Sequence, residues 1–203
     1  MEPADLAVIV WSSFAVLGIG LRAAIQWRRT GTTGLRGLSG EPGSLEWLGG
    51  VLFVLGLVFG IAGPVAQQEG TADPIAALDG RAGHVAGAVL AVGGLAATLY
   101  AQLAMGREWR IGVDPTERTG LVTGGPFALV RNPIYTAMLT SAVGIALLVP
   151  NPVTLAGLAT LVAAFEMQTR FVEEPHLRRL HGDAYLAYAS RVGRFVPGLG
   201  RLS

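Results

Sequence analysis

The sequence contains no cysteine and no lysine, and only 14% of its 203 residues are charged. Without cysteine, the chain can form neither a disulfide framework nor a thiolate metal site, and it cannot use a cysteine nucleophile. The composition is instead 51% hydrophobic, with a mean hydropathy of +0.50. This balance is typical of a membrane protein.

Five apolar segments predict membrane helices. Three of them reach the roughly 20 residues that a spanning helix needs, namely 6–25, 47–66 and 85–105. Two shorter segments are separated by Pro150-Asn151-Pro152 and predict a helical hairpin of residues 134–149 and 153–172. The expected fold is therefore all-α, a polytopic membrane protein with about five transmembrane helices. Arg22, near the end of the first helix, is placed to snorkel toward the interface.

Basic charge comes almost entirely from arginine and is unevenly distributed. Three arginines follow the first helix, four lie between the third and fourth, and six occur from Arg170 onward, against one between the second and third. The positive-inside rule then predicts an outside N-terminus and a cytoplasmic C-terminus. Segments 106–133 and 166–203 would share the cytoplasmic face. Arginine without lysine is typical of a GC-rich bacterial genome, so we expect a bacterial inner membrane.

The chain divides into two parts on this interpretation. Residues 1–105 form three amino-terminal transmembrane helices, and residues 106–203 form a functional core with a cytoplasmic loop, the hairpin and a carboxyl-terminal cytoplasmic helix. The polar residues that could carry chemistry lie in the second part.

The sequence RNPIY, residues 131–135, stands directly before the fourth apolar segment. Asn132 is suited to cap a helix and Pro133 to begin one, while Arg131 and Tyr135 would suit the interface. Trp109 and Arg110, after the third helix, also suit membrane anchors. On the residues alone, a purely structural role for this stretch is as well supported as a functional one.

Carboxylates lie on the helix that follows the hairpin turn. Glu166 and Glu173 share a helical face with Arg170 between them. A charge is costly in lipid, so Glu166 should face the bundle or a wet cavity, although a local ion pair with Arg170 explains it equally well. Adjacent Glu173 and Glu174 repel each other, and a cationic partner nearby would offset that repulsion.

The tail continues with tyrosines and arginines at helical spacing. Tyr185, Tyr188 and Arg191 are three residues apart, and Arg194 follows where the helix ends. An amphipathic interfacial helix explains this pattern without catalysis. A pair of arginines is also what recognition of a carboxylate or phosphate requires.

Three pieces in fixed order, GGPFALVRNPIY, FVEEPHL and HGDAYLAYASRVGRFVP, resemble the integral-membrane isoprenylcysteine carboxyl methyltransferase and phospholipid methyltransferase family. The resemblance covers about residues 109–197. Two positions depart from the family pattern. Asn132 stands where the family has a histidine, and an asparagine cannot act as a base near neutral pH. His181 stands where an aromatic residue usually precedes the glycine.

The resemblance implies transfer of a methyl group from S-adenosylmethionine to a lipophilic acceptor that enters from the bilayer, such as a prenylcysteine carboxylate, a lipid or another small lipophile. It implies no metal and no nucleic-acid partner. Arg191 and Arg194 would orient an acceptor oxygen, and Glu166 would position it through Arg170 or act as a base. The cofactor-binding candidates are Val122, Gly125, Arg131, Asn132, Pro133, Tyr135, Glu173, Glu174 and Tyr185.

Two other functions share parts of the pattern. Membrane sterol and steroid reductases have a similar carboxyl-terminal arrangement and use NADPH, but the histidine and a longer amino-terminal part are absent here. A non-enzymatic membrane protein whose arginines contact anionic lipid or a partner would also fit the arginine distribution. It gives no reason for the carboxylates Glu166, Glu173 and Glu174 on one helix.

Overall fold

The computed structural model describes residues 1–35, 40–110 and 120–202. Helices account for most of these residues, and Val130 and Gly193 form an isolated parallel β-bridge. The first helix consists of α1 (Pro3–Ser13), the π-helical η1 (Phe14–Leu21) and α2 (Arg22–Thr30) in continuous succession. It is followed by α3 (Leu45–Gln68), α4 (Arg81–Met105) and α5 (Pro133–Leu148). The last continuous helix consists of α6 (Pro152–Met167), the π-helical η4 (Gln168–Glu173) and α7 (Glu174–Ala189).

Three helices are long and apolar enough to cross a membrane: Pro3–Thr30, Leu45–Gln68 and Arg81–Glu108. The apolar helix α5 is shorter and pairs with α6. Large apolar side chains such as Val58 of α3 and Val89 of α4 are exposed, as expected for a surface that faces lipid. The chain is therefore an all-helical integral membrane protein, and the predicted polytopic fold and hairpin are confirmed.

Glycines let the membrane helices approach closely. Helix α4 packs along α5, and α3 packs along α6. A Cβ atom added to Gly144 of α5 would lie 2.2 Å from the backbone nitrogen of Ala91 on α4, and one added to Gly63 of α3 would lie 2.1 Å from Thr154 Oγ1 on α6. Such small-residue contacts bring backbones together where no hydrophobic effect drives association. These two helix pairs form the frame of the bundle.

The hairpin turn is fastened to α3 by Asn151. Its side-chain oxygen accepts a hydrogen bond from the Thr154 backbone N–H at 2.9 Å and so caps α6, while its Nδ2 donates to the Gly63 carbonyl at 2.9 Å. Asn151 is fully buried, and both ends of its amide are satisfied. The turn therefore has a fixed position relative to the long helices.

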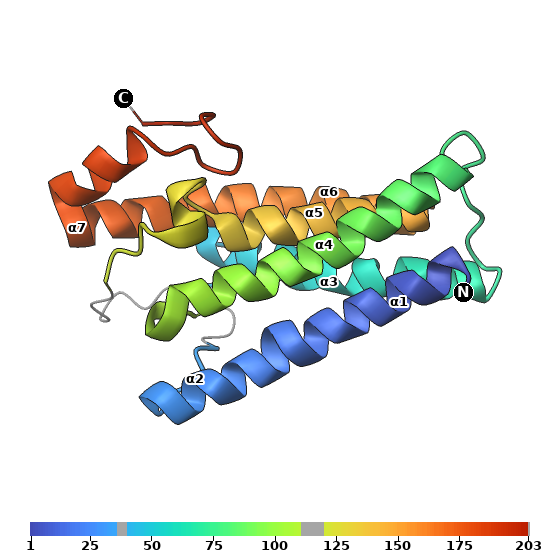
Figure 1. Ribbon diagram of the computed structural model, residues 1–203, viewed down its shortest axis with the longest axis horizontal. Helices are drawn as coiled ribbons and strands as arrows, with labels where there is room; N and C mark the ends of the chain where they lie inside the picture. Colours follow the sequence, from blue (N-terminus) through green and yellow to red (C-terminus); the bar gives the residue numbers. More distant parts are fainter. Residues whose placement is uncertain (36–39, 111–119, 203) are drawn as a thin grey trace.

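Different segments of the chain gather at the two ends of the bundle (Figure 1). The N-terminus and the loop after α3 lie at one end, while α2, α7 and the C-terminus gather at the other. The Arg131 backbone N–H donates to the Gly193 carbonyl at 2.8 Å, so the loop before α5 and the tail after α7 meet there. The two polar segments thus share one face. Arg36 and Arg118, which contribute to the charge count along the sequence, lie outside the described residues.

Two predictions about anchors are wrong. Arg22 does not snorkel, because it is only 2% exposed, its Nη2 donates to the Gly106 carbonyl at 2.5 Å, and its guanidinium carbon lies 4.5 Å from the centroid of the Trp109 ring. Trp109 is 1% exposed and therefore is not an interfacial anchor. A guanidinium can satisfy a carbonyl and stack on an aromatic ring together, and this contact ties the end of α4 to the first helix.

Candidate functional site

A cavity of about 460 Å³ lies at the end of the bundle where the polar segments meet. This volume is within the usual range for a small-molecule site. The first helix, α3, α4, α5, α6 and α7 all contribute to its wall. Gly125 is absent from the wall, but the other predicted cofactor residues are part of it, namely Val122, Arg131, Asn132, Pro133, Tyr135, Glu173, Glu174 and Tyr185.

Glu174 is the point at which two arginines converge. Arg131 Nη2 and Arg194 Nε each donate to Glu174 Oε1 at 2.7 Å, and Arg194 Nη2 donates to Oε2 at 2.9 Å. These charge-assisted hydrogen bonds hold the pKa of Glu174 below its usual value although burial acts most strongly in the opposite direction. The predicted cationic partner of the acidic pair therefore exists and consists of protein arginines.

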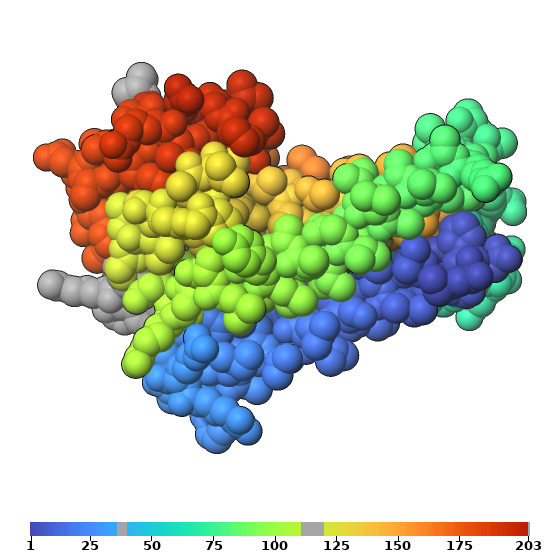
Figure 2. All heavy atoms as spheres, viewed as in Figure 1, coloured from blue at the N-terminus to red at the C-terminus, as the bar shows by residue number. Residues whose placement is uncertain are grey.

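Arg131 also fixes the carboxyl-terminal tail. Its Nη1 donates to the carbonyls of Ala189 and Val192, and its Nη2 donates to that of Gly200 at 3.0 Å. Figure 2 shows the tail lying against the segment that leads into α5. We call the group Arg131, Glu174 and Arg194 the tail clasp. Because Arg131 and Glu174 belong to the cavity wall, the clasp joins the tail to the site.

Asn132 occupies the position before the first residue of α5, as predicted, but its side chain does not cap the helix. Its Nδ2 and its backbone N–H both donate to the Arg194 carbonyl at 3.1 Å. Thr136 Oγ1 donates to the Phe195 carbonyl at 2.9 Å in the same region. The capping prediction is wrong because the docked tail offers the amide a carbonyl, which an asparagine nitrogen can satisfy.

Glu173 is in a different environment from its neighbour. Its Oε1 accepts a hydrogen bond from the Tyr135 hydroxyl at 2.5 Å, and the Tyr135 ring stacks on Phe165 with a centroid separation of 4.4 Å. Burial raises the pKa of Glu173, while the Tyr135 hydrogen bond and the charge of Arg110 act in the opposite direction. The carboxylate is therefore costly to ionise here, and a further cation in the cavity would offset that cost.

Two tyrosines of α7 complete this part of the wall. Burial raises the pKa of Tyr185 and of Tyr188 to about 12. The Tyr188 hydroxyl donates to the Phe127 carbonyl at 2.6 Å. Both phenols are therefore neutral at physiological pH, and they serve as hydrogen-bonding and packing groups.

The four predicted catalytic residues do not belong to the cavity wall. Glu166 and Arg170 form an ion pair with each other, with side chains 38% and 52% exposed. Arg191 is exposed, and the Arg194 guanidinium is engaged with Glu174. The placement of Glu166 and Arg170 agrees with the local ion pair that the sequence left open as an alternative.

Other wall residues were not singled out by the sequence. His176 is buried and lies in the quoted FVEEPHL piece. Gln102 belongs to a helix that was interpreted by its apolar pattern, and Gln168 to a helical segment that was interpreted by its charged residues. An uncharged amide within an apolar helix is a polar group in a costly place, and that signal could have identified Gln102. Glu173 and Gln168 lie on η4, and π-helical turns often accompany functional sites.

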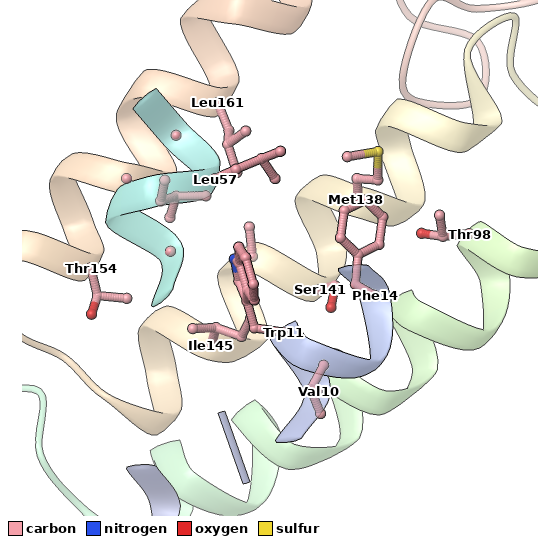
Figure 3. A pocket seen from close by; sticks show the side chains of 15 residues that line it. Val10, Trp11, Phe14, Leu57, Thr98, Met138, Ser141, Ile145, Thr154 and Leu161 are labelled. Carbon is pink, nitrogen blue, oxygen red and sulfur yellow. The ribbon is translucent and has the colours of Figure 1, made fainter. Parts of the chain in front are cut away.

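A second cavity of about 50 Å³ adjoins the first within the bundle (Figure 3). Trp11 and Phe14 project into it from the first helix, and Ile145 and Leu161 line it from the hairpin. Phe14 and Met138 line both cavities. The larger cavity therefore has a small, mainly apolar cavity among the membrane helices as its neighbour.

A model of the phospholipid methyltransferase family matches residues 82–184, just over half of the chain. The chain belongs to this family. The matched region extends from the first residues of α4 into α7 and includes Arg131, Tyr135, Glu173 and Glu174. The resemblance inferred from the sequence pieces is confirmed.

The chain also resembles individual curated proteins. It is 37% identical over 87 residues to protein-S-isoprenylcysteine O-methyltransferase A of Arabidopsis thaliana. The aligned residues make up 43% of this chain and 44% of that protein. The B protein of the same plant is 33% identical over 81 residues, or 40% of this chain and 41% of that protein. The chain thus matches less than half the length of these two relatives.

A third relative has a different name. The nickel-cobalt-cadmium resistance protein NccN of Alcaligenes xylosoxydans xylosoxydans is 29% identical over 116 residues, covering 57% of this chain and 53% of that protein. Within residues 1–35, 40–110 and 120–202, no group of three or more histidine, aspartate or glutamate side chains is arranged to hold a metal ion.

Proposed function

We propose that this protein transfers a methyl group from S-adenosylmethionine to a lipophilic acceptor that reaches the cavity from the bilayer. The observation that carries the proposal is the composition of one cavity. Its wall joins the family-motif residues Tyr135 and Glu173 to apolar side chains of membrane helices, including Phe14 and Phe53. A polar ligand and an apolar ligand could therefore meet there.

The wall fits the chemistry of this cofactor. When bound, S-adenosylmethionine supplies a methyl group on a positively charged sulfur. Glu173 is a half-buried carboxylate with a raised pKa, and a cation at hydrogen-bonding or ion-pair distance would favour its ionised form. Tyr135, held by Glu173 and Phe165, offers an aromatic edge and ring to a cation or to a planar base. Val122, Asn132, Pro133 and Tyr185 would complete the contact surface.

Glu174 has a different role in this proposal from the one the sequence indicated. Its two oxygens already accept three hydrogen bonds from Arg131 and Arg194. It therefore holds the tail clasp closed, and Glu173 is the carboxylate that meets the cofactor. Arg194 acts as a positioning residue for the tail. Roles for Arg191, Glu166 and Arg170 in orienting or deprotonating the acceptor stay predictions, and their exposed positions give these roles no support.

The acceptor site is supported by the apolar half of the wall. Phe14 and Met138 separate the large cavity from the small one, which lies among membrane helices and has an apolar lining. A prenyl or acyl group would gain roughly 25 cal/mol for each Å² of apolar surface removed from water. A carboxylate acceptor needs no base, whereas an amine needs one, and Glu173 with its raised pKa could take that proton.

Calorimetric binding to detergent-purified protein tests the cofactor assignment. We expect micromolar binding of S-adenosylmethionine and S-adenosylhomocysteine, and none of NADPH. Glu173→Gln should weaken S-adenosylmethionine more than S-adenosylhomocysteine if Glu173 faces the sulfonium, because only the former carries that charge. Glu166→Gln is the matched control on the same continuous helix, and it should leave both affinities within about twofold. Binding of NADPH alone would overturn the proposal in favour of a reductase.

The membrane orientation is proposed from arginine distribution, with the N-terminus outside, the cavity at the cytoplasmic end and the inner membrane of a bacterium as the location. The absence of native cysteine makes single-cysteine labelling straightforward. Suitable variants are Thr71→Cys and Ser190→Cys, because both residues are exposed. Thr71 belongs to the loop after α3 and Ser190 follows α7, and these segments lie at opposite ends of the bundle (Figure 1). An impermeant maleimide added to intact cells should label the first alone, and the reverse pattern would invert the topology.

A further inference from the structure

Gln102 is a buried amide on α4 that belongs to the wall of the large cavity. It is 3% exposed and lies in a helix that is otherwise apolar around it. It is remote in sequence from the family motifs before α5 and after α6. The proposed function described above does not use it.

The orientation of this amide is fixed by one hydrogen bond. Gln102 Nε2 donates to the Gly18 carbonyl of η1 at 3.0 Å. A carbonyl oxygen can only accept, so the amide nitrogen must face it and Oε1 must face away. Oε1 is buried and accepts no hydrogen bond from any residue within the described ranges.

Neighbouring polar groups do not supply the missing donor. Thr98, one turn earlier on α4, donates its hydroxyl to the Gly94 carbonyl at 2.8 Å. Arg22 of the adjacent helix uses Nη1 for Gln26 and Nη2 for the Gly106 carbonyl, and its buried Nε donates to no group within the described ranges, Gln102 Oε1 included. Buried acceptors without a partner are uncommon in folded proteins, and where one occurs in a ligand-sized cavity, a ligand is a direct explanation.

We propose that Gln102 Oε1 accepts a hydrogen bond from an N–H or O–H group of the ligand that fills the cavity. This inference rests on the proposed function and adds to it a positioning residue that is fastened to the first helix. The donor belongs either to the cofactor, which carries amino and hydroxyl groups, or to the acceptor, for which an amide N–H is the matching chemistry.

The test measures binding to wild type, Gln102→Met, Gln102→Leu and Thr98→Val in detergent, with S-adenosylhomocysteine as the first probe. The second probe is N-acetyl-S-prenylcysteine, added at saturating S-adenosylhomocysteine. Thr98→Val is the matched control, because it removes a fully buried hydroxyl from the same helix without removing a group from the large cavity. Melting temperatures establish that each variant is folded. Two replacements of Gln102 are used so that the test still works if one of them does not fold.

Loss of one hydrogen bond should weaken one probe about three- to tenfold in both Gln102 variants, while Thr98→Val stays within about twofold. A loss confined to S-adenosylhomocysteine assigns the donor to the cofactor, and a loss confined to the second probe assigns it to the acceptor. If wild type and both folded Gln102 variants bind the two probes equally, Oε1 meets only water and the inference is wrong. Wild type that binds neither probe would instead overturn the proposed function, and the Gln102 assignment with it.

Discussion

Replacement of Glu174 by glutamine removes one charge and changes almost no volume. The carboxylate accepts three hydrogen bonds from Arg131 and Arg194, two at 2.7 Å and one at 2.9 Å. A glutamine amide has one oxygen for these donors, and its NH₂ group would face a guanidinium N–H. The two arginines would then lie close together without a counter-charge.

The expected loss of stability follows from burial. Removing one partner of a buried ion pair costs about 3 to 5 kcal/mol. The side chain of Arg131 is 2% exposed, but that of Arg194 is 13% exposed, so water can reach part of the second cation and the lower half of this range applies. At about 2 to 4 °C for each kcal/mol in a chain of this size, the melting temperature should fall by roughly 6 to 16 °C.

The matched control is Glu173→Gln at the adjacent position. Burial raises the pKa of Glu173, so ionising this carboxyl group costs more in the folded protein than in the unfolded chain. A glutamine keeps an acceptor for the Tyr135 hydroxyl and removes that cost. Thermal unfolding in detergent, followed by tryptophan fluorescence, should therefore show an unchanged or higher melting temperature for Glu173→Gln. A Glu174→Gln protein that melts within about 2 °C of wild type would refute the reasoning.

The pH dependence gives a second check on Glu174. Its pKa in the folded protein lies below the ordinary value of 4.5, because the arginines favour the charged form. Its contribution to the free energy of unfolding is therefore complete above that ordinary value and is lost as the pH falls through the folded pKa. Between about pH 5 and pH 3, wild type should lose more melting temperature than Glu174→Gln, which has no such group to protonate.

Three further changes test other parts of the structure. Gly144→Ala would place a Cβ 2.2 Å from the Ala91 nitrogen, so α4 and α5 must separate, and the detergent melting curve should report a loss of about 1 to 3 kcal/mol or more. Arg22→Met loses the charged hydrogen bond to the Gly106 carbonyl and should cost about 1.5 to 3 kcal/mol in the same assay. Met138 lines both cavities, and Met138→Trp would fill part of the space where they meet. Methylation of a long prenylcysteine should therefore slow about tenfold, while the affinity for S-adenosylhomocysteine, measured by calorimetry, stays unchanged.

The membrane fold could be predicted from the sequence because its determinants are local. Apolar length identified the long helices, and Pro150-Asn151-Pro152 identified the hairpin turn, where α5 ends at Leu148 and α6 begins at Pro152. Such signals require no knowledge of neighbours in space. Arg22 is an exception. An arginine near a helix end predicts a snorkelling side chain, and only the structure shows that the carbonyl of Gly106 and the ring of Trp109 lie beside it.

The site could be predicted only in part, for a related reason. Seven of the eight predicted wall residues lie in the family motifs, yet helical spacing says which residues share a face and not where that face points. Glu166 and Arg170 share a face that is exposed. Arg194 could not be paired from spacing, because its partner Glu174 lies 20 residues earlier, across the turn after α7. Gln102 belongs to no family motif; its polarity within an apolar helix is visible in the sequence, but the missing donor for its Oε1 is visible only in the folded structure.

The motif residues divide by what they contact, and the division changes how variants should be interpreted. Tyr135 and Glu173 form one hydrogen-bonded pair, while Arg131, Glu174 and Arg194 hold the tail against the segment before α5. Since the docked tail and the cavity wall share Arg131 and Glu174, we expect a broken clasp to loosen the wall and so to weaken cofactor binding. An inactive Arg194 variant is therefore no proof that Arg194 touches the acceptor. Only a variant that keeps its melting temperature and its S-adenosylhomocysteine affinity, yet fails to turn over, would assign an arginine to the chemistry.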